Sequence, residues 1–332
     1  MKRNLTQICF AALFLIVLHS CSKSSNNNNP VPPTVKPDTL ATGWTKIPVS
    51  VQGAVDVFFN TAATGYSFFD GCYKTTDGGL TWAKLPFAFG NAENMAVTND
   101  GKIFIVGNIN TIFRSIDGGA NFTTNTISGS GPFTDIFFSD NNNGFTASST
   151  GLYQTTDGGN TWNLVNPSTG LILTPPGYSS SYFISPTTGW ITSGNLVFKS
   201  NGSINSWTKS NFTGTQPSVS VMSIYAASPT VIFTGCGDGN VFKSIDGGVN
   251  FSLVAGFAAS AGGSSGYLDV HFTSVTNGYA SYGNRIYKTT DGGNSWVPVV
   301  ALGNAVFTEI HFVDANHGWG CTSKGEILRY FQ

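Results

Sequence analysis

The sequence predicts an all-β fold, a single seven-bladed β-propeller whose blades are four-stranded antiparallel sheets. Three observations support this prediction. A short glycine-rich motif recurs, and its closing aromatic residues are 40 to 45 residues apart. A hairpin pattern precedes the motif in several repeats. The chain ends in an incomplete repeat, and a segment near residue 44 resembles the missing strand. A period of this length, with several strands per unit, is typical of propellers.

The recurring motif joins a hydroxyl residue, an aspartate, two glycines and an aromatic residue. Its five copies are TTDGGLTW from Thr75, SIDGGANF from Ser115, TTDGGNTW from Thr155, SIDGGVNF from Ser244 and TTDGGNSW from Thr289. A sixth segment, SNGSINSW, keeps the first hydroxyl and Trp207 but lacks the aspartate and the double glycine. The repeat frame therefore persists where the motif itself has decayed.

Each residue type in the motif has a structural explanation. We expect the aspartate to accept hydrogen bonds from its own turn, the glycine to supply a positive φ, and the aromatic residue to anchor the outer strand. We assign these roles to Asp77, Gly79, Trp82, Asp117, Gly119, Phe122, Asp157, Gly159, Trp162, Asp246, Gly248, Phe251, Asp291, Gly293 and Trp296. Because the aspartates lie in five different blades, they cannot converge on one metal ion or one substrate bond.

A hairpin precedes the motif in the clearest repeats. It reads VDVFFNTAATGY from Val55, TDIFFSDNNNGF from Thr134, LDVHFTSVTNGY from Leu268 and TEIHFVDANHGW from Thr308. Alternating apolar residues lead through an Asn/Asp/Gly turn to a glycine and an aromatic residue, as in a β-hairpin. In the first blade we expect strands a, b, c and d near residues 57, 66, 74 and 82, and the same order elsewhere.

Two incomplete repeats at the ends of this region predict how the ring closes. The segment GWTKIPV at Trp44 resembles an outer strand d, with no motif before it. The final segment, GEILRYFQ, resembles a strand c, with no motif after it. We therefore expect the segment at Trp44 to complete the last blade, which gives seven blades and leaves only short exposed edges.

The N-terminal residues resemble an export signal. Lys2 and Arg3 precede an apolar run from Ile8 to Leu18 that is too short to span a bilayer. The run ends in Leu-His-Ser-Cys21, which resembles a bacterial lipobox, with plain secretion as the alternative. We expect a signal peptide over 1–20, a lipidated Cys21 with a polar, Pro-rich tether over 21–43, and the propeller over 44–332. The expected location is the bacterial outer membrane or cell surface, with the lipid as the only membrane contact.

Charge and cysteine content narrow the classes of partner. The net charge is -1 and no cluster of Lys or Arg is present, so nucleic acid is not an expected partner. After export and lipidation, Cys72, Cys236 and Cys321 would remain, an odd number that excludes a disulfide-built scaffold. Cys72 and Cys321 fall in b-to-c turns of neighbouring blades, where they could either form a disulfide or stay as buried thiols.

The motif resembles the BNR or Asp-box repeat of sialidases and related propellers. Together with the element FVDANHGW from Phe312, it is similar to the photosystem II stability/assembly factor-like propellers over residues 44 to 332. This resemblance implies an extracytoplasmic scaffold that binds a protein or assists assembly, with no cofactor. The expected partner is an envelope or surface protein; a glycan-binding or sialidase-like module is the alternative.

The sialidase alternative can be tested on the residues. The sialidases that carry such repeats use three arginines around the substrate carboxylate. After the expected signal peptide, this chain has only Arg114, Arg285 and Arg329. Arg114 and Arg329 occupy the strand-c position of Lys74, and Arg285 is expected in a b-to-c loop. No arginine triad can be assembled, so we expect no catalytic residues. A glycosidase would instead need a carboxylate pair, for which the acids to check are Glu93, Glu309, Asp70 and Asp238.

Function in a symmetric ring must come from residues that break the symmetry. His271 and His311 share one strand-a position in adjacent blades, with Asp269 and Glu309 two residues earlier. They could hold a metal or form a hydrogen-bonded pair packed between sheets, and we expect the pair and no metal. The position of Asp269 and Glu309 is polar in other repeats, at Asp56, Asn94 and Asp135. It could be a structural cap, which we favour, or an acidic mouth of the central channel.

The loops between blades contain the most irregular sequence. Two are long, LVNPSTGLILTPPGYSSS from Leu164 and AGFAASAGGSSGY from Ala255. Long surface loops on a rigid scaffold are where recognition commonly occurs. We therefore assign a partner surface to Leu171, Ile172, Leu173 and Tyr178 with Arg285, local packing of the apolar residues being the alternative.

Overall fold

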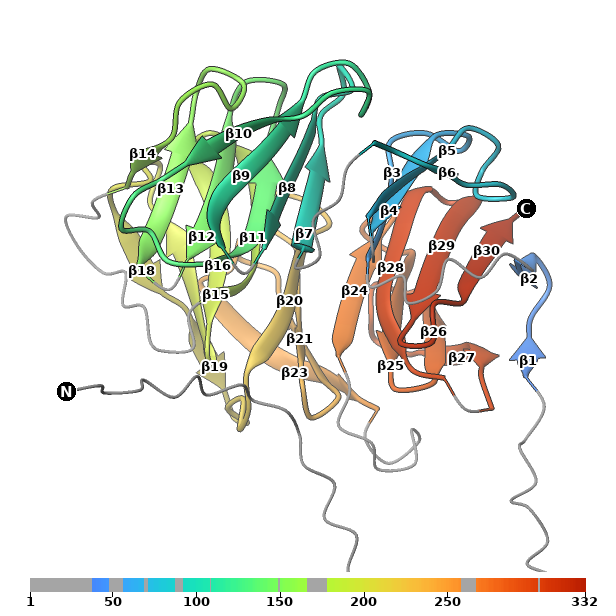
Figure 1. Cartoon of the computed structure of the whole chain (residues 1–332). Coiled ribbons are helices and arrows are strands. Elements are labelled where there is room, and N and C mark those ends of the chain that lie inside the picture. The colour runs from blue at the N-terminus through green and yellow to red at the C-terminus, as the bar shows by residue number, and fades with distance from the viewer. Residues whose placement is uncertain are drawn as a thin grey trace, which may run out of the picture. The chain divides into compact units, whose positions relative to one another are not determined.

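The computed structural model describes residues 38–47, 56–68, 71–86, 92–107, 109–148, 150–165, 178–257, 267–303 and 305–332. All of them belong to one compact unit over residues 36–332. Within this unit the strands form seven sheets, antiparallel except for one added strand, which contact one another through their first strands (Figure 1). The predicted seven-bladed propeller is therefore confirmed.

Strands a to d follow one another in the chain in each of the first five blades. Blade 1 contains β3 (Asp56–Phe59), β4 (Gly65–Phe68), β5 (Cys72–Thr75) and β6 (Ala83–Lys84). Blade 2 contains β7 (Ala92–Val97), β8 (Ile103–Gly107), β9 (Ile109–Ser115) and β10 (Thr123–Thr126). Blade 3 contains β11 (Phe133–Phe138), β12 (Gly144–Ser148), β13 (Gly151–Thr155) and β14 (Asn163–Leu164). Blade 4 contains β15 (Tyr178–Ser185), β16 (Thr188–Ser193), β17 (Leu196–Ser200) and β18 (Trp207–Lys209). Blade 5 contains β20 (Val221–Ala226), β21 (Ile232–Cys236), β22 (Asn240–Ser244) and β23 (Asn250–Gly256).

The last blade is completed by the N-terminal part of the described chain. Blade 6 contains β24 (Leu268–Phe272), β25 (Gly278–Tyr282), β26 (Arg285–Thr289) and β27 (Val297–Ala301), and blade 7 contains β28 (Phe307–Asp314), β29 (His317–Thr322) and β30 (Ile327–Phe331). Strand β2 (Trp44–Lys46) pairs antiparallel with β30, with Trp44 opposite Tyr330 (Figure 1). The Trp44 side chain is buried and packs edge-on against Tyr279 and Phe312. The predicted closure is confirmed.

Two blades carry a fifth strand, which differs from the expected four strands in every blade. Strand β1 (Thr39–Leu40) pairs with the outer edge of β27, and Asp38 accepts a hydrogen bond from the backbone N–H of Gly303 at 2.9 Å. Strand β19 (Asn211–Thr213) adds in parallel to β23. These short strands cover sheet edges that would otherwise present unpaired backbone groups. Residues 38–43, expected in the tether, therefore lie on the propeller.

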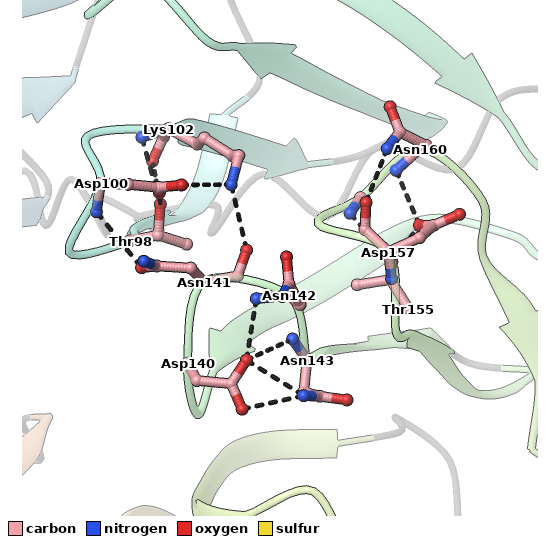
Figure 2. Close-up of polar contacts among 11 residues, drawn as sticks. Thr98, Asp100, Lys102, Asp140, Asn141, Asn142, Asn143, Thr155, Asp157 and Asn160 are labelled. Carbon is pink, nitrogen blue, oxygen red and sulfur yellow. Dashed lines mark hydrogen bonds and ion pairs between the residues drawn. The ribbon is translucent and has the colours of Figure 1, made fainter.

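The motif turns satisfy their own polar groups and also connect neighbouring blades. In blade 3 the Thr155 hydroxyl donates to Asp157 at 2.8 Å and accepts from the N–H of Gly159 at 2.9 Å. Figure 2 shows this turn beside the hairpin turn at Asp140. Gly159 has a φ of +78°, and a Cβ there would lie 2.2 Å from the buried ring of Phe104 in blade 2. The second glycine is thus required both by φ and by the closeness of the preceding blade.

Side chains on one blade also donate to the turns of the next. Lys102 of blade 2 reaches the carbonyl of Asn141 in blade 3 at 3.2 Å and pairs with Asp100 (Figure 2). Trp190 of blade 4 donates to Gly247 of blade 5, and Trp319 of blade 7 to Gly78 of blade 1, both at 2.9 Å. These bonds fix the angle between neighbouring blades and so the geometry of the channel at the centre.

Candidate functional site

The innermost strands of the seven blades surround a channel of about 390 Å³. In each blade two alternate residues of strand a face this channel, because side chains two positions apart lie on the same side of a strand. They form two belts, one above the other. The polar belt consists of Asp56, Asn94, Asp135, Ser180, Ser223, Asp269 and Glu309. The aromatic belt consists of Phe58, Phe137, Tyr182, Tyr225, His271 and His311, with Ala96 at the seventh position.

Three carboxyl groups of the polar belt each join their own blade to the next. Asp269 accepts a hydrogen bond from the backbone N–H of Ile310 at 3.1 Å. Asp56 accepts in the same way from Met95, and Asp135 from Ser181. These bonds agree with the predicted structural cap. The same carboxyl groups also line the channel wall.

The environment of the carboxyl groups opposes their ionisation. Burial raises the pKa of Asp56 to about 7 and the pKa of Asp135 and of Asp269 to about 6. Burial, with the nearby carboxylate of Asp269, raises the pKa of Glu309 well above its ordinary value. No lysine or arginine lies among the described residues that line the channel. The channel is therefore acidic and lacks a compensating positive side chain from its own walls.

The aromatic belt is continuous around six blades. Its neighbouring ring centroids are separated by 4.6 Å from Phe58 to His311, 5.3 Å from His311 to His271 and 4.6 Å from His271 to Tyr225. Tyr182 continues the belt to Phe137 at 5.1 Å. Ala96 leaves a gap between Phe137 and Phe58, so one side of the channel is wider at this level.

The two histidines line the channel and also pack between neighbouring sheets, as predicted: His311 of blade 7 lies against Phe58 of blade 1, and His271 of blade 6 lies against Tyr225 of blade 5. His311 Nε2 donates to the carbonyl of Phe59 in blade 1 at 2.8 Å, and the Tyr225 hydroxyl donates to Phe272 in blade 6 at 2.8 Å. Burial lowers the pKa of His271 well below its ordinary value and the pKa of His311 to about 4. Both imidazoles are thus neutral at pH 7. Within the described residues, no group of three or more His, Cys, Asp or Glu side chains is arranged to hold a metal.

One buried group of the polar belt has no partner. The Ser223 side chain is 8% exposed, and no hydrogen-bond partner for its Oγ exists within the described residues. Buried hydroxyls are normally hydrogen-bonded. Sequence reasoning missed Ser180 and Ser223 because the hairpins of blades 4 and 5 lack the pattern that identified the other members.

The remaining predicted residues lie outside this channel. The motif aspartates accept hydrogen bonds within their own turns. In blade 3, for example, the backbone N–H and the hydroxyl of Thr161 donate to Asp157. These bonds lower the pKa of Asp157 to about 2, although partial desolvation opposes them. Arg285 begins β26 and is not a loop residue as expected; with Phe257, Tyr287 and Trp296 it lines a separate hollow of about 360 Å³. Leu171, Ile172, Leu173 and Cys21 lie outside the described residues, as does the side chain of Tyr178 at the start of β15.

The cysteines and the glycosidase acids can be placed in the same way. Cys72, Cys236 and Cys321 are buried free thiols, so Cys72 and Cys321 form no disulfide. Of the acids to check for a glycosidase, only Glu309 lines the channel; Asp238 bonds to Asn240 in a turn, and Asp70 lies outside the described residues. Glu93 is not among the residues of the channel wall. The acids that do converge with Glu309 are Asp56, Asp135 and Asp269.

These features define a class, the seven-bladed β-propeller with a polar central channel. Among solved structures, the chain is similar to YCF48 from Cyanidioschyzon merolae, with 18% identity over 87% of this chain and 98% of that one and a TM-score of 0.70. A structure titled YCF48 bound to D1 peptide matches with 18% identity over 87% and 94% of the two chains and a TM-score of 0.67. The WD40 propeller domain of Doa1 matches with 11% identity over 89% and 97% and a TM-score of 0.67.

The likeness to YCF48 confirms, for the fold, the resemblance predicted from the repeats. No protein-family model matches the sequence, and neither does any curated protein. In the part of the chain that the structure describes, no helix has the length and apolar character needed to cross a membrane.

Proposed function

We propose that this chain is an exported, lipid-anchored propeller that binds a protein of the cell envelope and acts as an assembly scaffold. One observation carries the proposal. Within the described residues, polar side chains from all seven blades converge at the channel, while the repeated motif turns use their polar groups internally. A rigid ring whose central channel is polar, and whose motif turns already satisfy their own hydrogen-bonding groups, is suited to binding a partner.

The likeness to YCF48 supports a protein as the partner. One of the matching structures holds YCF48 with a peptide, so a ring of similar architecture can present a peptide-binding surface. The lipobox-like Leu-His-Ser-Cys21 supports the anchor, and the polar segment after it supports a tether to the membrane surface.

The channel carboxyl groups do not favour the glycosidase alternative. Glycosidases need one carboxyl that stays protonated and another that is ionised as nucleophile or base, so their environments push the two pKa values apart. Here burial raises the pKa of all four carboxyl groups. Asp269 and Glu309, whose pKa values are pushed apart, are hydrogen-bonded to each other and so lie closer than the separation of about 5 Å or more that a glycosidase needs. In addition, Arg114, Arg285 and Arg329 lie on β9, β26 and β30, in three blades, and none lines the channel. We propose that the chain is not an enzyme.

The partner can be sought by affinity capture of the full chain from detergent-solubilised membranes of its own cells. We expect one envelope protein to co-purify in stoichiometric amount with the wild type and with Lys209→Gln, a control at an exposed surface position. Recovery of the propeller without any stoichiometric protein, together with turnover of a glycoside substrate, would overturn the scaffold proposal.

The anchor has its own test. Metabolic labelling with a radioactive fatty acid is expected to mark the wild type, and Cys21→Ala is expected to lose the label and leave the membrane fraction. An unlabelled wild-type protein released to the soluble fraction would show plain secretion and contradict the anchor.

A further inference from the structure

A hollow of about 360 Å³ lies apart from the channel, between strand β23 of blade 5 and strands β26 and β27 of blade 6. Arg285, the first residue of β26, lines it, and no other charged residue does so within the described part of the chain. An arginine side chain is always protonated in proteins. The hollow therefore offers one positive charge with no acid beside it in the wall.

The Arg285 side chain is not used in the joints between blades. No hydrogen bond or ion pair connects it to another described residue. Its Nε atom is covered, so this atom cannot meet a ligand, but the two terminal nitrogens are not covered in this way. Lys243 of blade 5, by contrast, donates to the carbonyl of Gly292 in blade 6 at 2.7 Å. The charge of Arg285 thus remains to pair with a group from outside the chain.

An arginine at this position also breaks the symmetry of the ring. Arg285 lies four residues before Thr289, the hydroxyl residue that begins the motif of blade 6. The residues at the same position of blades 1 to 5 and of blade 7 are Gly71, Thr111, Gly151, Leu196, Asn240 and Glu326. None of them is a cation. A charge that the architecture required would recur, so this one indicates a role outside the architecture.

Most of the remaining wall is apolar. At its base the buried rings of Phe257 and Tyr287 are stacked with their centroids 4.1 Å apart, and Trp296 meets Phe257 edge-on at 5.7 Å. Trp296 is only partly buried and Pro298 is exposed, so both present carbon surface to an occupant. Ligand sites commonly combine such a wall with a few polar groups that fix orientation. An occupant with an anionic end and an apolar neighbour therefore fits this hollow.

A single guanidinium favours a carboxylate over a phosphate. Its planar fork matches the two oxygens of a carboxylate, which accept two parallel N–H···O bonds. One positive charge balances one carboxylate, whereas a phosphate monoester carries about two negative charges at neutral pH. Since no second cation lines the hollow among the described residues, a phosphate would keep an uncompensated charge there.

A second hollow adjoins the first and indicates an extended occupant. It has a volume of about 430 Å³ and shares the wall residues Val254 and Asn294 with the hollow at Arg285. Its two charged residues, Lys243 and Asp246, are already hydrogen-bonded, whereas Ile245 is 74% exposed. The second hollow therefore offers apolar contact. An occupant that fills both hollows needs more than one small acid, and a peptide segment meets this need.

We propose that the hollow at Arg285 binds the carboxylate of an Asp or Glu side chain in an extended segment of a protein partner, and that the adjoining hollow takes an apolar side chain of the same segment. The inference rests on the scaffold function, because the segment belongs to the partner. It adds a contact at the seam between blades 5 and 6, apart from the channel.

The test is calorimetric titration of the full chain in a non-ionic detergent at neutral pH. The probes are the peptide acetyl-Leu-Phe-Glu-Leu-amide and the same peptide with Gln in place of Glu. We expect saturable binding of the Glu peptide that weakens as ionic strength rises, with the Gln peptide at least tenfold weaker. Phenylacetate, a small acid that reaches only the first hollow, should bind at least tenfold more weakly than the Glu peptide.

Variants connect the binding to the two hollows. Arg285→Gln should weaken the Glu peptide at least tenfold and leave the Gln peptide unchanged, and Arg285→Lys, which keeps the charge without the fork, should have an intermediate effect. Ile245→Ser should weaken both peptides several-fold. Arg114→Gln is the matched control, because Arg114 also has a covered Nε without a partner but does not line the hollow. It should bind as the wild type does, and thermal unfolding checks that each variant is folded.

The outcomes separate the site from the scaffold function. Equal affinity of the Glu and Gln peptides, or unchanged binding in Arg285→Gln, overturns the carboxylate site. Phenylacetate that binds as tightly as the Glu peptide overturns the extended occupant. In affinity capture, an envelope protein held by the wild type and lost by Arg285→Gln supports both proposals, whereas equal capture by the two chains overturns the site and keeps the scaffold. Binding of the Glu peptide without any captured protein supports the site and counts against the scaffold.

Discussion

The motif turns and the channel place the same residue type in opposite environments. Asp157 sits in an outer turn among donors of its own loop, which lower its pKa to about 2. Asp135 sits in the channel, where burial raises its pKa to about 6 despite bonds from Ser181. One carboxyl stabilises the fold as an anion, whereas the other is retained at an electrostatic cost. The motif aspartates, which bond within their own turns in five blades, thus serve the architecture, whereas channel carboxyl groups that carry such a cost are candidates for a site.

The largest expected effect concerns the turns. Gly159→Ala places a Cβ 2.2 Å from Phe104, a buried ring that is stacked on Phe138, at a φ of +78°. Left-handed strain and overpacking together should lower the free energy of unfolding by about 2 to 5 kcal/mol. Gly129→Ala is the matched control, because Gly129 has a φ of +80° with nothing within 4 Å of its Cβ. It should lose only about 1 kcal/mol.

Urea unfolding of the two glycine variants measures this difference. If both lose the same free energy, the second glycine is required for backbone conformation alone, and the motif turn has no packing role between blades. The motif turns would then differ from the channel only in their local hydrogen bonds.

Contacts between blades, such as that of Gly159 with Phe104, mark the limit of what the sequence can predict. The motif and hairpin are local signals, so they predicted the blades, the closure at Trp44 and strands a to d. Strands β1 and β19 are only two and three residues long, too short to show a periodicity. The convergence of Asp56, Asp135, Asp269 and Glu309 depends on the radius of the ring. Alternation predicts that two side chains share a face, but not how near the opposite blade lies.

The second prediction is a pH dependence with opposite signs in the two regions. The raised pKa of Asp135 favours its protonated form in the folded state, so this stabilisation is complete below about pH 4 and is lost as pH rises through about 6. The lowered pKa of Asp157 favours its anion, so that stabilisation is present above about pH 4 and is lost as pH falls through about 2. Taken together, these two groups place maximum stability near about pH 4.

Unfolding free energies measured from pH 3 to 8 test this pattern. Asp135→Asn should reduce the loss of stability between pH 4 and 7 by about 1 to 3 kcal/mol. Asp157→Asn should leave that loss unchanged and lower stability at pH 7, where the anion is required. Parallel curves for the wild type and Asp135→Asn would show that the channel carboxyl groups do not titrate differently on folding.

The smallest effect compares two buried serines. The Ser244 hydroxyl in the motif turn of blade 5 donates to Asp246 at 2.7 Å and accepts from the N–H of Gly248 at 2.8 Å, whereas the Ser223 hydroxyl has no partner among the described residues. Ser244→Ala leaves a buried N–H unsatisfied and should lower the free energy of unfolding by about 1 to 2 kcal/mol. Ser223→Ala loses no hydrogen bond, so its stability should stay within about 0.5 kcal/mol of the wild type. A clear loss in Ser223→Ala would mean that its hydroxyl is already bonded in the empty protein. In that case the Ser223 hydroxyl would have a structural role, as the Ser244 hydroxyl does. The two serines would then no longer distinguish the channel from the motif turns.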